Sequence, residues 1–274
     1  MTTITPNSFA TDGHGWAELL PPRQPTPALR RDCWVAWVVV GAGLTGLADN
    51  CRRINRINRA GLELLDTQVA ENDIDCQWRR AGFHHTAADA AALEEYRHFI
   101  RYLEALEIKH QPLDKVTMRD LLGTNMYQAG IHITDGALVQ PAALVRGLAD
   151  TLPENVRLHE QSPVLEIGRG APITLHLKTV TVKTDKLIVA TNFESGKLGL
   201  LSSYIVGSTL AGSFTRKLKP DELASLGSLT EWGAISLHSG GATLRLTADS
   251  RISIRNTAEY RGSTLLNDEE LTKR

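Results

Sequence analysis

The stretch that most constrains the fold is the apolar run 33–40, CWVAWVVV, which is followed by three closely spaced glycines. The run is apolar on both faces and rich in β-branched residues, which is typical of a central strand in a parallel sheet. Gly41, Gly43 and Gly46 follow in the pattern GxGxxG, and the residues after them have helical spacing. We predict a strand, a tight turn and a helix, which is the geometry of a dinucleotide-binding turn.

Each glycine has a separate physical role in such a turn. Gly41 permits the tight bend, Gly43 lets the backbone approach a pyrophosphate, and Gly46 lets the helix pack closely on the strand. A glycine-rich turn that binds no ligand is the alternative. The motif also requires an acidic residue about 20 positions on, at the end of a second strand. Glu63 and Asp66 have this spacing, but both fall in a helical pattern, and no second strand is recognisable.

The helical pattern extends over 44–72 and has two unlike sides. Its apolar residues recur at helical spacing, and four arginines, at positions 52, 53, 56 and 59, lie on the other side. We interpret the basic side as a solvated helix surface, with an anion site as the alternative.

The rest of the chain mixes helical and strand patterns. Helices are expected at 87–108, at 116–123 with Gly123 as its end, and from Pro141 onward. Alternating or apolar runs predict strands at 75–87, 129–134, 155–168 and 173–190, and the region from 204 to 257 is rich in strands and turns.

Composition excludes several classes of function. The net charge of −1 gives no field that would hold nucleic acid or an anionic membrane surface. No apolar run approaches the roughly 20 residues that a membrane span requires, and the N-terminus lacks the order of a secretory signal. Cys33, Cys51 and Cys76 show no CxxC pairing, so neither a disulfide framework nor a metal site is expected. A cytoplasmic location is the default expectation.

Several segments together resemble a known family. These are VVVGAGLTGLA, IDCQWRRAGFHHTA, GIHITDGALVQPAALVRGLA, NVRLHEQSPVLEI, KLIVATN and LRLTADSRISIRN, and they occur in this order between residues 30 and 265. In this order they resemble FAD-dependent oxidoreductases of the D-amino-acid-oxidase-like (DAO) superfamily, and the gamma-glutamylputrescine oxidoreductase type most of all. The resemblance implies a flavoprotein that oxidises a C–N bond of a small amine or amino acid by hydride transfer to flavin.

The resemblance also implies which residues contact FAD. Gly41, Ala42, Gly43 and Gly46 would hold the pyrophosphate, and the backbone of Val164 would meet the adenine. The strand end formed by residues 190–192 (Ala190, Thr191 and Asn192) would close over the cofactor near the phosphates. Catalytic residues and the oligomeric state are left open, and no metal is expected.

The chain departs from the family pattern just after Ala48. The family continues into a second strand that ends in Glu and a turn over the flavin, whereas here the helix at 51–71 follows directly. The comparison with the family suggests an internal loss on the order of 60 to 70 residues and a C-terminal truncation within a helix start at 266–274. A non-catalytic remnant that no longer binds FAD productively is therefore the alternative to an active enzyme.

Other candidate groups have simpler explanations. His84 and His85 fall on one strand and must face opposite sides, so both cannot line one pocket. His132 and Asp135 fit a strand end, and Ser195-Gly196 and Ser239-Gly240 lack the context of a hydrolase nucleophile. Three arginines that could hold a carboxylate are interpreted as surface charges of a hairpin, namely Arg245, Arg251 and Arg255.

The expected fold class is α/β, with an incomplete Rossmann-like FAD-binding domain and an antiparallel-sheet α+β substrate domain. The FAD-binding domain would be discontinuous, at 31–75 and 140–200. The substrate domain would comprise 76–139 and 201–265, after an extended N-terminal arm at 1–30.

Overall fold

The computed structural model describes residues 20–21, 24, 26–30, 32–40, 51–205, 208–238 and 241–260. The chain divides into two compact units, residues 1–47 with 145–207 and residues 48–144 with 208–274. The fold is mixed α/β, as predicted, and its first unit is discontinuous. The prediction from the sequence includes residues 48–75 in the nucleotide-binding domain, whereas the contacts between Cα atoms group them with the second unit.

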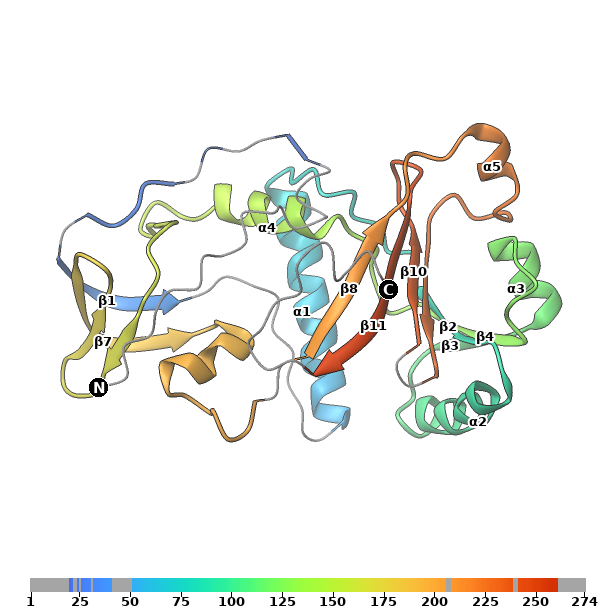
Figure 1. Ribbon diagram of the computed structural model, residues 1–274, viewed down its shortest axis with the longest axis horizontal. Helices are drawn as coiled ribbons and strands as arrows, with labels where there is room; N and C mark the ends of the chain where they lie inside the picture. The colour runs from blue at the N-terminus through green and yellow to red at the C-terminus, as the bar shows by residue number, and fades with distance from the viewer. Residues whose placement is uncertain are drawn as a thin grey trace. The chain divides into compact units, whose positions relative to one another are not determined.

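The first unit is built on a sheet with the order β1-β7-β6-β5 among the described residues. Its strands are β1 (Cys33–Val40), β5 (Glu166–Gly168), β6 (Ile173–His176) and β7 (Thr181–Val189). β1 and β7 are parallel, and they lie side by side in Figure 1. β5, β6 and β7 form an antiparallel meander. The sheet therefore joins one parallel pair to a hairpin extension.

Hydrogen bonds from side chains fix where β1 enters this sheet. The backbone N–H of Thr181 donates to Oδ1 of Asp32 at 2.7 Å, which aligns the starts of β7 and β1. The N–H of Leu29 donates to Oγ of Ser162 at 2.7 Å, and the N–H of Glu160 donates to Oγ1 of Thr26 at 3.0 Å. Because the N–H of Glu160 donates to Thr26, it is not available to a neighbouring strand. Of the predicted strand at 155–168, only residues 166–168 form a strand.

The second unit contains a larger, mostly antiparallel sheet. In the described part of the chain its order is β3-β4-β2-β9-β10-β11-β8. The strands are β2 (Phe83–Ala87), β3 (His110–Asp114), β4 (Ala129–Ile133), β8 (Ser208–Phe214), β9 (Trp232–Ser236), β10 (Thr243–Leu246) and β11 (Ile252–Tyr260). Only the β2–β9 pair among these described strands is parallel. This sheet is the predicted antiparallel-sheet portion.

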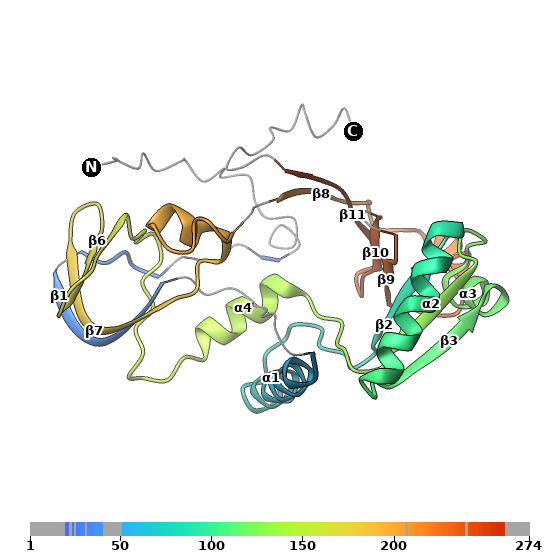
Figure 2. The same ribbon diagram turned by 90° about the horizontal axis from the view of Figure 1, so that it is seen from below.

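Helices cover the β2–β3–β4 part of this sheet on both faces. α2 (Ala90–Ala105) lies against β2 and β4, where Leu103 packs with Ile131 and Ile133. Figure 2 shows α2 beside β2. α3 (Lys115–Leu122) packs on β3 and β4 with Met118 and Leu122. The second apolar cluster also contains Leu113, Tyr127, Trp232, Ala234 and Leu246. Two cores therefore flank one sheet.

Three further helices are present among the described residues. α1 (Cys51–Glu71) is the predicted helix after the glycines, and Asp66 on it accepts a hydrogen bond from Nε1 of Trp78. α4 (Pro141–Asp150) begins at the predicted proline. α5 (Pro220–Ala224) is short, and its carboxylate Glu222 accepts from the N–H of Lys219 at 2.8 Å.

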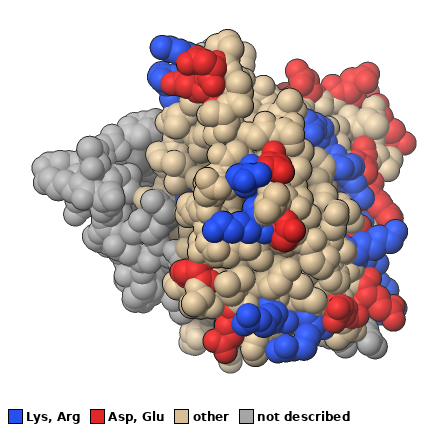
Figure 3. Space-filling view, turned by 90° about the vertical axis from the view of Figure 1, so that its right-hand side faces the viewer, with Lys and Arg blue, Asp and Glu red and all other residues tan. Residues whose placement is uncertain are grey.

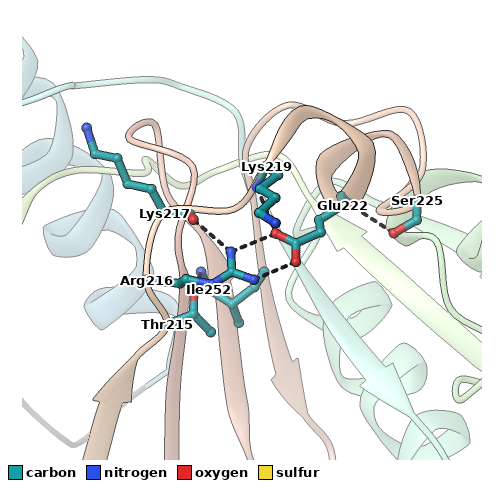
Figure 4. Close-up of polar contacts among 7 residues, drawn as sticks. All are labelled: Thr215, Arg216, Lys217, Lys219, Glu222, Ser225 and Ile252. Atoms are coloured by element: carbon teal, nitrogen blue, oxygen red, sulfur yellow. Dashed lines mark hydrogen bonds and ion pairs between the residues drawn. The ribbon is translucent and has the colours of Figure 1, made fainter.

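An exposed ion pair fastens α5 to the end of β8. Figure 4 shows the guanidinium of Arg216 in a two-pronged contact with Glu222, at 2.6 and 2.8 Å. The hydrogen bonds from Arg216, followed by that from the Lys219 N–H, lower the pKa of Glu222 to about 2. On the adjoining strand, Oγ1 of Thr215 accepts from the N–H of Ile252 at 3.0 Å. The pair therefore closes a small loop against the β8–β11 edge.

Two glycines permit a close backbone contact between α3 and the loop after α5. Gly123 ends α3 in the left-handed region at φ +70°, and Gly227 also has a positive φ, at +78°. A Cβ on Gly123 would lie 2.2 Å from the carbonyl oxygen of Ser225, and one on Gly227 would lie 2.5 Å from that of Leu121. Neither position accepts a side chain without movement of the backbone.

We predict that Gly123→Ala destabilises the protein by about 2 kcal/mol or more, because it adds a backbone clash to an unfavourable φ. The free energy of unfolding, measured with urea, checks this. The matched control is Gly212→Ala on β8, where the nearest atom to a new Cβ is 3.9 Å away; it should change stability by less than about 0.5 kcal/mol. Equal effects of the two variants would contradict the prediction.

Candidate functional site

The candidate nucleotide site is the edge where β1 and β7 end. Val40 is in register with Val189, so the two parallel strands end side by side. The next residues in the sequence are Gly41 and Ala190. In open α/β sheets, ligands bind at the carboxyl ends of such strands, beyond the last residue of each. The parallel pair therefore places Val40, the last described residue before the glycine motif, level with Val189, the residue before Ala190.

The glycine motif itself lies outside the described residues. Gly41, Ala42, Gly43 and Gly46 therefore remain predicted FAD contacts. The structure describes β1, the strand that precedes these residues, and its parallel partner β7.

The segment after β7 folds into a short 3₁₀ helix, η1 (Asn192–Leu198). Ala190 and Thr191 are half-buried, while Asn192 is exposed and has a left-handed φ of 50°. The hydroxyl of Thr191 is 2.9 Å from that of the buried Ser195. The Thr191 carbonyl accepts from the N–H of Glu194 at 3.1 Å. This ties the strand end into a defined turn and explains the role of Ser195, which sequence reasoning considered only as a nucleophile.

Val164 lies at the other end of the same sheet. The N–H of Leu165 donates to the carbonyl of His176, and His176 is in register with Thr181, the first residue of β7. Ala190 follows the last residue of β7, so roughly 30 Å of extended strand separates the two levels. The described sheet therefore does not bring Val164 together with residues 190–192, and its adenine contact remains a prediction.

The two acidic residues at the spacing of a ribose-binding acid both lie on α1. Asp66 is engaged with Trp78 and with Nε of Arg80, at 3.5 Å from the latter. Glu63 is exposed, and neither residue stands at the end of a strand. In the described residues β1 has β7 as its one strand neighbour and forms an edge of the sheet. No described residue therefore takes the place of the ribose-binding acid.

The histidines of β2 face opposite sides of the sheet, as the alternation predicted. His84 is stacked on His132 of β4 with ring centroids 4.8 Å apart, and its Nδ1 is 3.4 Å from the carbonyl of Gly233. His85 instead meets Phe99 of α2 edge-on, at 4.6 Å between centroids. Burial, with a smaller contribution from His132, lowers the pKa of His84 to about 4, and burial lowers the pKa of His85 to about 4. Both are neutral at neutral pH, with His84 buried and His85 half-buried.

His132 and Asp135 do not form an acid–base pair. Nε2 of His132 is 3.0 Å from the carbonyl of Ala81, whereas Asp135 is paired with Arg59 of α1 at 2.8 Å. The interpretation of these two as strand-end residues is consistent with this arrangement.

Arg245 is not the surface charge that the hairpin pattern predicted. Leu246 on β10 packs in the apolar core, so Arg245 points to the opposite face of the sheet. There its guanidinium donates to the carbonyl of Val139. Burial lowers the pKa of Arg245, and the charge of Glu231 partly offsets this. The prediction was wrong for this residue, because the loop that covers it comes from a distant part of the chain.

The other two hairpin arginines behave differently. Arg255 is exposed and donates to Oγ1 of Thr243 at 2.7 Å, as a surface charge should. Arg251 bridges Asp249, at 2.9 Å, and the carbonyl of Thr215, at 2.9 Å. It joins the turn of the hairpin to the end of β8.

Other classes of site find no support in the described residues. They contain no group of three or more His, Cys, Asp and Glu side chains placed to hold a metal ion. A search of the described helices finds none with the length and apolarity of a membrane span. On the face seen in Figure 3, Lys and Arg are intermixed with Asp and Glu rather than gathered by sign.

We predict that stability falls as the pH drops from about 6.5 to about 4. The unfolded chain protonates His84 and His85 near pH 6.5 and the folded one only near pH 4, so the unfolded state binds more protons in this window. The loss should be on the order of 2 kcal/mol per histidine, measured by urea unfolding at each pH. His85→Phe should flatten the dependence, whereas the exposed control His98→Gln should not. An unchanged pH profile in His85→Phe would contradict this assignment.

Comparison with known proteins gives the family. A sequence profile described as DAO, FAD dependent oxidoreductase, matches residues 36–273. No curated protein sequence matches the chain.

Solved structures of similar fold are distant in sequence. Glycine oxidase from Geobacillus kaustophilus is 15% identical with a TM-score of 0.61, over 79% of this chain and 58% of that one. L-proline dehydrogenase from P. horikoshii is 13% identical with a TM-score of 0.61, over 85% and 63%. L-amino acid deaminase from Proteus vulgaris is 16% identical with a TM-score of 0.58, over 85% and 63%.

These likenesses concern the fold, and the chain spans less than two thirds of the length of each of these three proteins. The family profile covers most of the chain, from within β1 to the last residues of the sequence. The chain therefore belongs to the DAO family of FAD dependent oxidoreductases, the family that its motifs resemble.

Proposed function

We propose that this chain binds FAD and oxidises a C–N bond of a small amine or amino acid. The observation that carries the proposal is the parallel register of β1 and β7, which ends at Val40 and Val189. In the sequence, the GxGxxG motif follows Val40 directly. Family membership supports the cofactor, and structures of similar fold include proteins described as a glycine oxidase and an L-amino acid deaminase.

The residues at the carboxyl edge suit a dinucleotide. Val40 and Val189 end two adjacent parallel strands, and the residue that follows Val189 is the small Ala190. In this proposal Gly41, Gly43 and Gly46 hold the pyrophosphate. The turn fixed by Thr191 and Ser195, at 2.9 Å between hydroxyls, keeps residues 190–192 in place next to it.

Bound FAD would accept the hydride, and the protein would position it and exclude water. The catalytic residues stay open. Among amine oxidising types, we favour the gamma-glutamylputrescine oxidoreductase type, because the segments VVVGAGLTGLA and LRLTADSRISIRN resemble it most.

A second candidate is a protein that descends from such a flavoenzyme but no longer binds FAD productively. The specific observation in its favour is the edge position of β1 among the described residues, although its sequence is typical of a central strand. The helix α1 begins ten residues or so after β1, where a βαβ unit would continue through its helix into a second strand. An internal loss between residues 48 and 51 would account for both features.

We predict that the expressed chain retains FAD through gel filtration, with its absorbance coeluting with the protein. Gly43→Val should weaken FAD binding at least tenfold, because a side chain there blocks backbone approach to the pyrophosphate. FAD titration followed by flavin fluorescence measures this, and circular dichroism checks that the variant is folded. Gly212→Ala is the control, since Gly212 is not part of the GxGxxG motif and a Cβ there would have its nearest neighbouring atom 3.9 Å away, so binding should be unchanged.

Three outcomes separate the candidates. FAD binding together with oxidation of amines or amino acids supports the enzyme. FAD binding without turnover on any tested amine or amino acid supports the second candidate. A folded chain that binds neither FAD nor ADP overturns the nucleotide site itself.

A further inference from the structure

One face of α1 carries an exposed apolar stripe. The side chains of Ile57 and Leu64 are 49% and 61% exposed. Ala60, Thr67 and Glu71 are exposed on the same face. Positions 57, 60, 64, 67 and 71 are separated alternately by three and four residues, which is the spacing of a seam between two paired helices.

The opposite face of α1 packs on the rest of the second unit. Leu62, Leu65 and Val69 are half-buried there. On the same side, Asp66 accepts from Trp78 and Arg59 pairs with Asp135 at 2.8 Å. The helix is thus already fastened along one side, and the stripe lies on the side that these contacts leave exposed.

The charges along α1 are divided between its two halves. The first half has four arginines, at 52, 53, 56 and 59, and no acid, while the second half has Glu63, Asp66 and Glu71 and no base. The first turn has no acidic residue, and the last turn has no basic one. This order opposes the helix dipole, which favours acids at the N-terminus and bases at the C-terminus. The stability of the single helix therefore does not account for it.

We propose that α1 pairs antiparallel with α1 of a second copy of this chain. A two-fold axis near position 62 places Ala60 beside Leu64 of the second copy and Ile57 beside Thr67 of the second copy. Arg56 in the basic half of each helix then lies near Glu71 in the acidic half of the other, whereas Arg59 and Asp66 lie on the packed face and do not take part. A parallel pair would instead place arginines beside arginines, so the charges select the antiparallel orientation.

The association is weak to moderate. α1 has 21 residues and is about 31 Å long, close to three heptads, which is short for a paired helix. Glu63 flanks the stripe near the two-fold axis, where it lies beside Glu63 of the second copy and reduces the affinity. A dissociation constant in the micromolar range is the expected result.

We predict that the full chain sediments as a monomer–dimer equilibrium, and that Leu64→Glu weakens the dimer at least tenfold. The same charge placed off the stripe in Asn58→Glu, which is also exposed on α1, should have little effect. Sedimentation equilibrium over a concentration series up to about 100 µM measures the affinity. Thermal unfolding checks that both variants fold. A wild-type chain that stays monomeric, or equal weakening by both variants, overturns the proposal.

Charge exchange tests the orientation separately. In the antiparallel pair Arg56 lies near Glu71 of the second copy, so Arg56→Glu and Glu71→Arg should each weaken the dimer. The double variant should recover most of the lost affinity, because the two reversed charges again face each other. Additive weakening in the double variant would overturn the antiparallel arrangement. The readout does not involve flavin, so failure here is independent of the proposed enzymatic function.

Discussion

The parallel pairing of β1 with β7 is the constraint on which the first unit depends. It joins two segments that are far apart in sequence, with Asp32 and Thr181, 149 residues apart, hydrogen bonded at the start of the pair. Residues 48–144, which lie between the two strands in the sequence, belong to the second unit. The pairing fixes where both strands end, with Val40 level with Val189.

The second unit also depends on a distant pairing, that of β2 with β9, in which His84 is in register with Ala234. Its strands are mostly antiparallel, and α2 and α3 cover two faces of the same sheet with separate apolar clusters. Polar residues are tolerated inside it only with partners or at an energetic cost. His84 stacks on His132 beside a backbone carbonyl, and burial keeps it neutral. Arg245 retains a carbonyl partner beneath a loop. Among its described residues no group of three or more His, Cys, Asp and Glu side chains is placed to hold a metal ion.

α1 bears both on the proposed nucleotide site and on the proposed pairing between copies. It occupies the place in the sequence where a βαβ unit would continue to a second strand, yet its contacts are with the second unit. Its position explains why neither Glu63 nor Asp66 can act as a strand-end acid. The same helix has an exposed stripe and a divided charge pattern, which is the basis for pairing between copies.

Local patterns were sufficient for much of the fold. Helical periodicity predicted α1, α2 and α3, and the chemistry of single residues predicted that α3 ends at Gly123 and that α4 begins at Pro141. The alternation of β2 predicted that His84 and His85 face opposite sides. Several different motifs in a fixed order predicted the family and its fold class. These features depend on residues close together in the chain, so one sequence contains enough information for them.

Only the tertiary structure decided features that depend on distant segments. Side-chain bonds from Thr26 and Ser162 replaced the ladder that alternation predicted upstream of β5. A loop at 136–140 buried Arg245, and the register of the meander placed Val164 at the opposite end of β7 from Ala190. The sequence by itself determined which segments are helix, strand and turn, because those follow from periodicity and backbone preference. It did not determine which segments meet, because that depends on loop closure and packing across the whole chain.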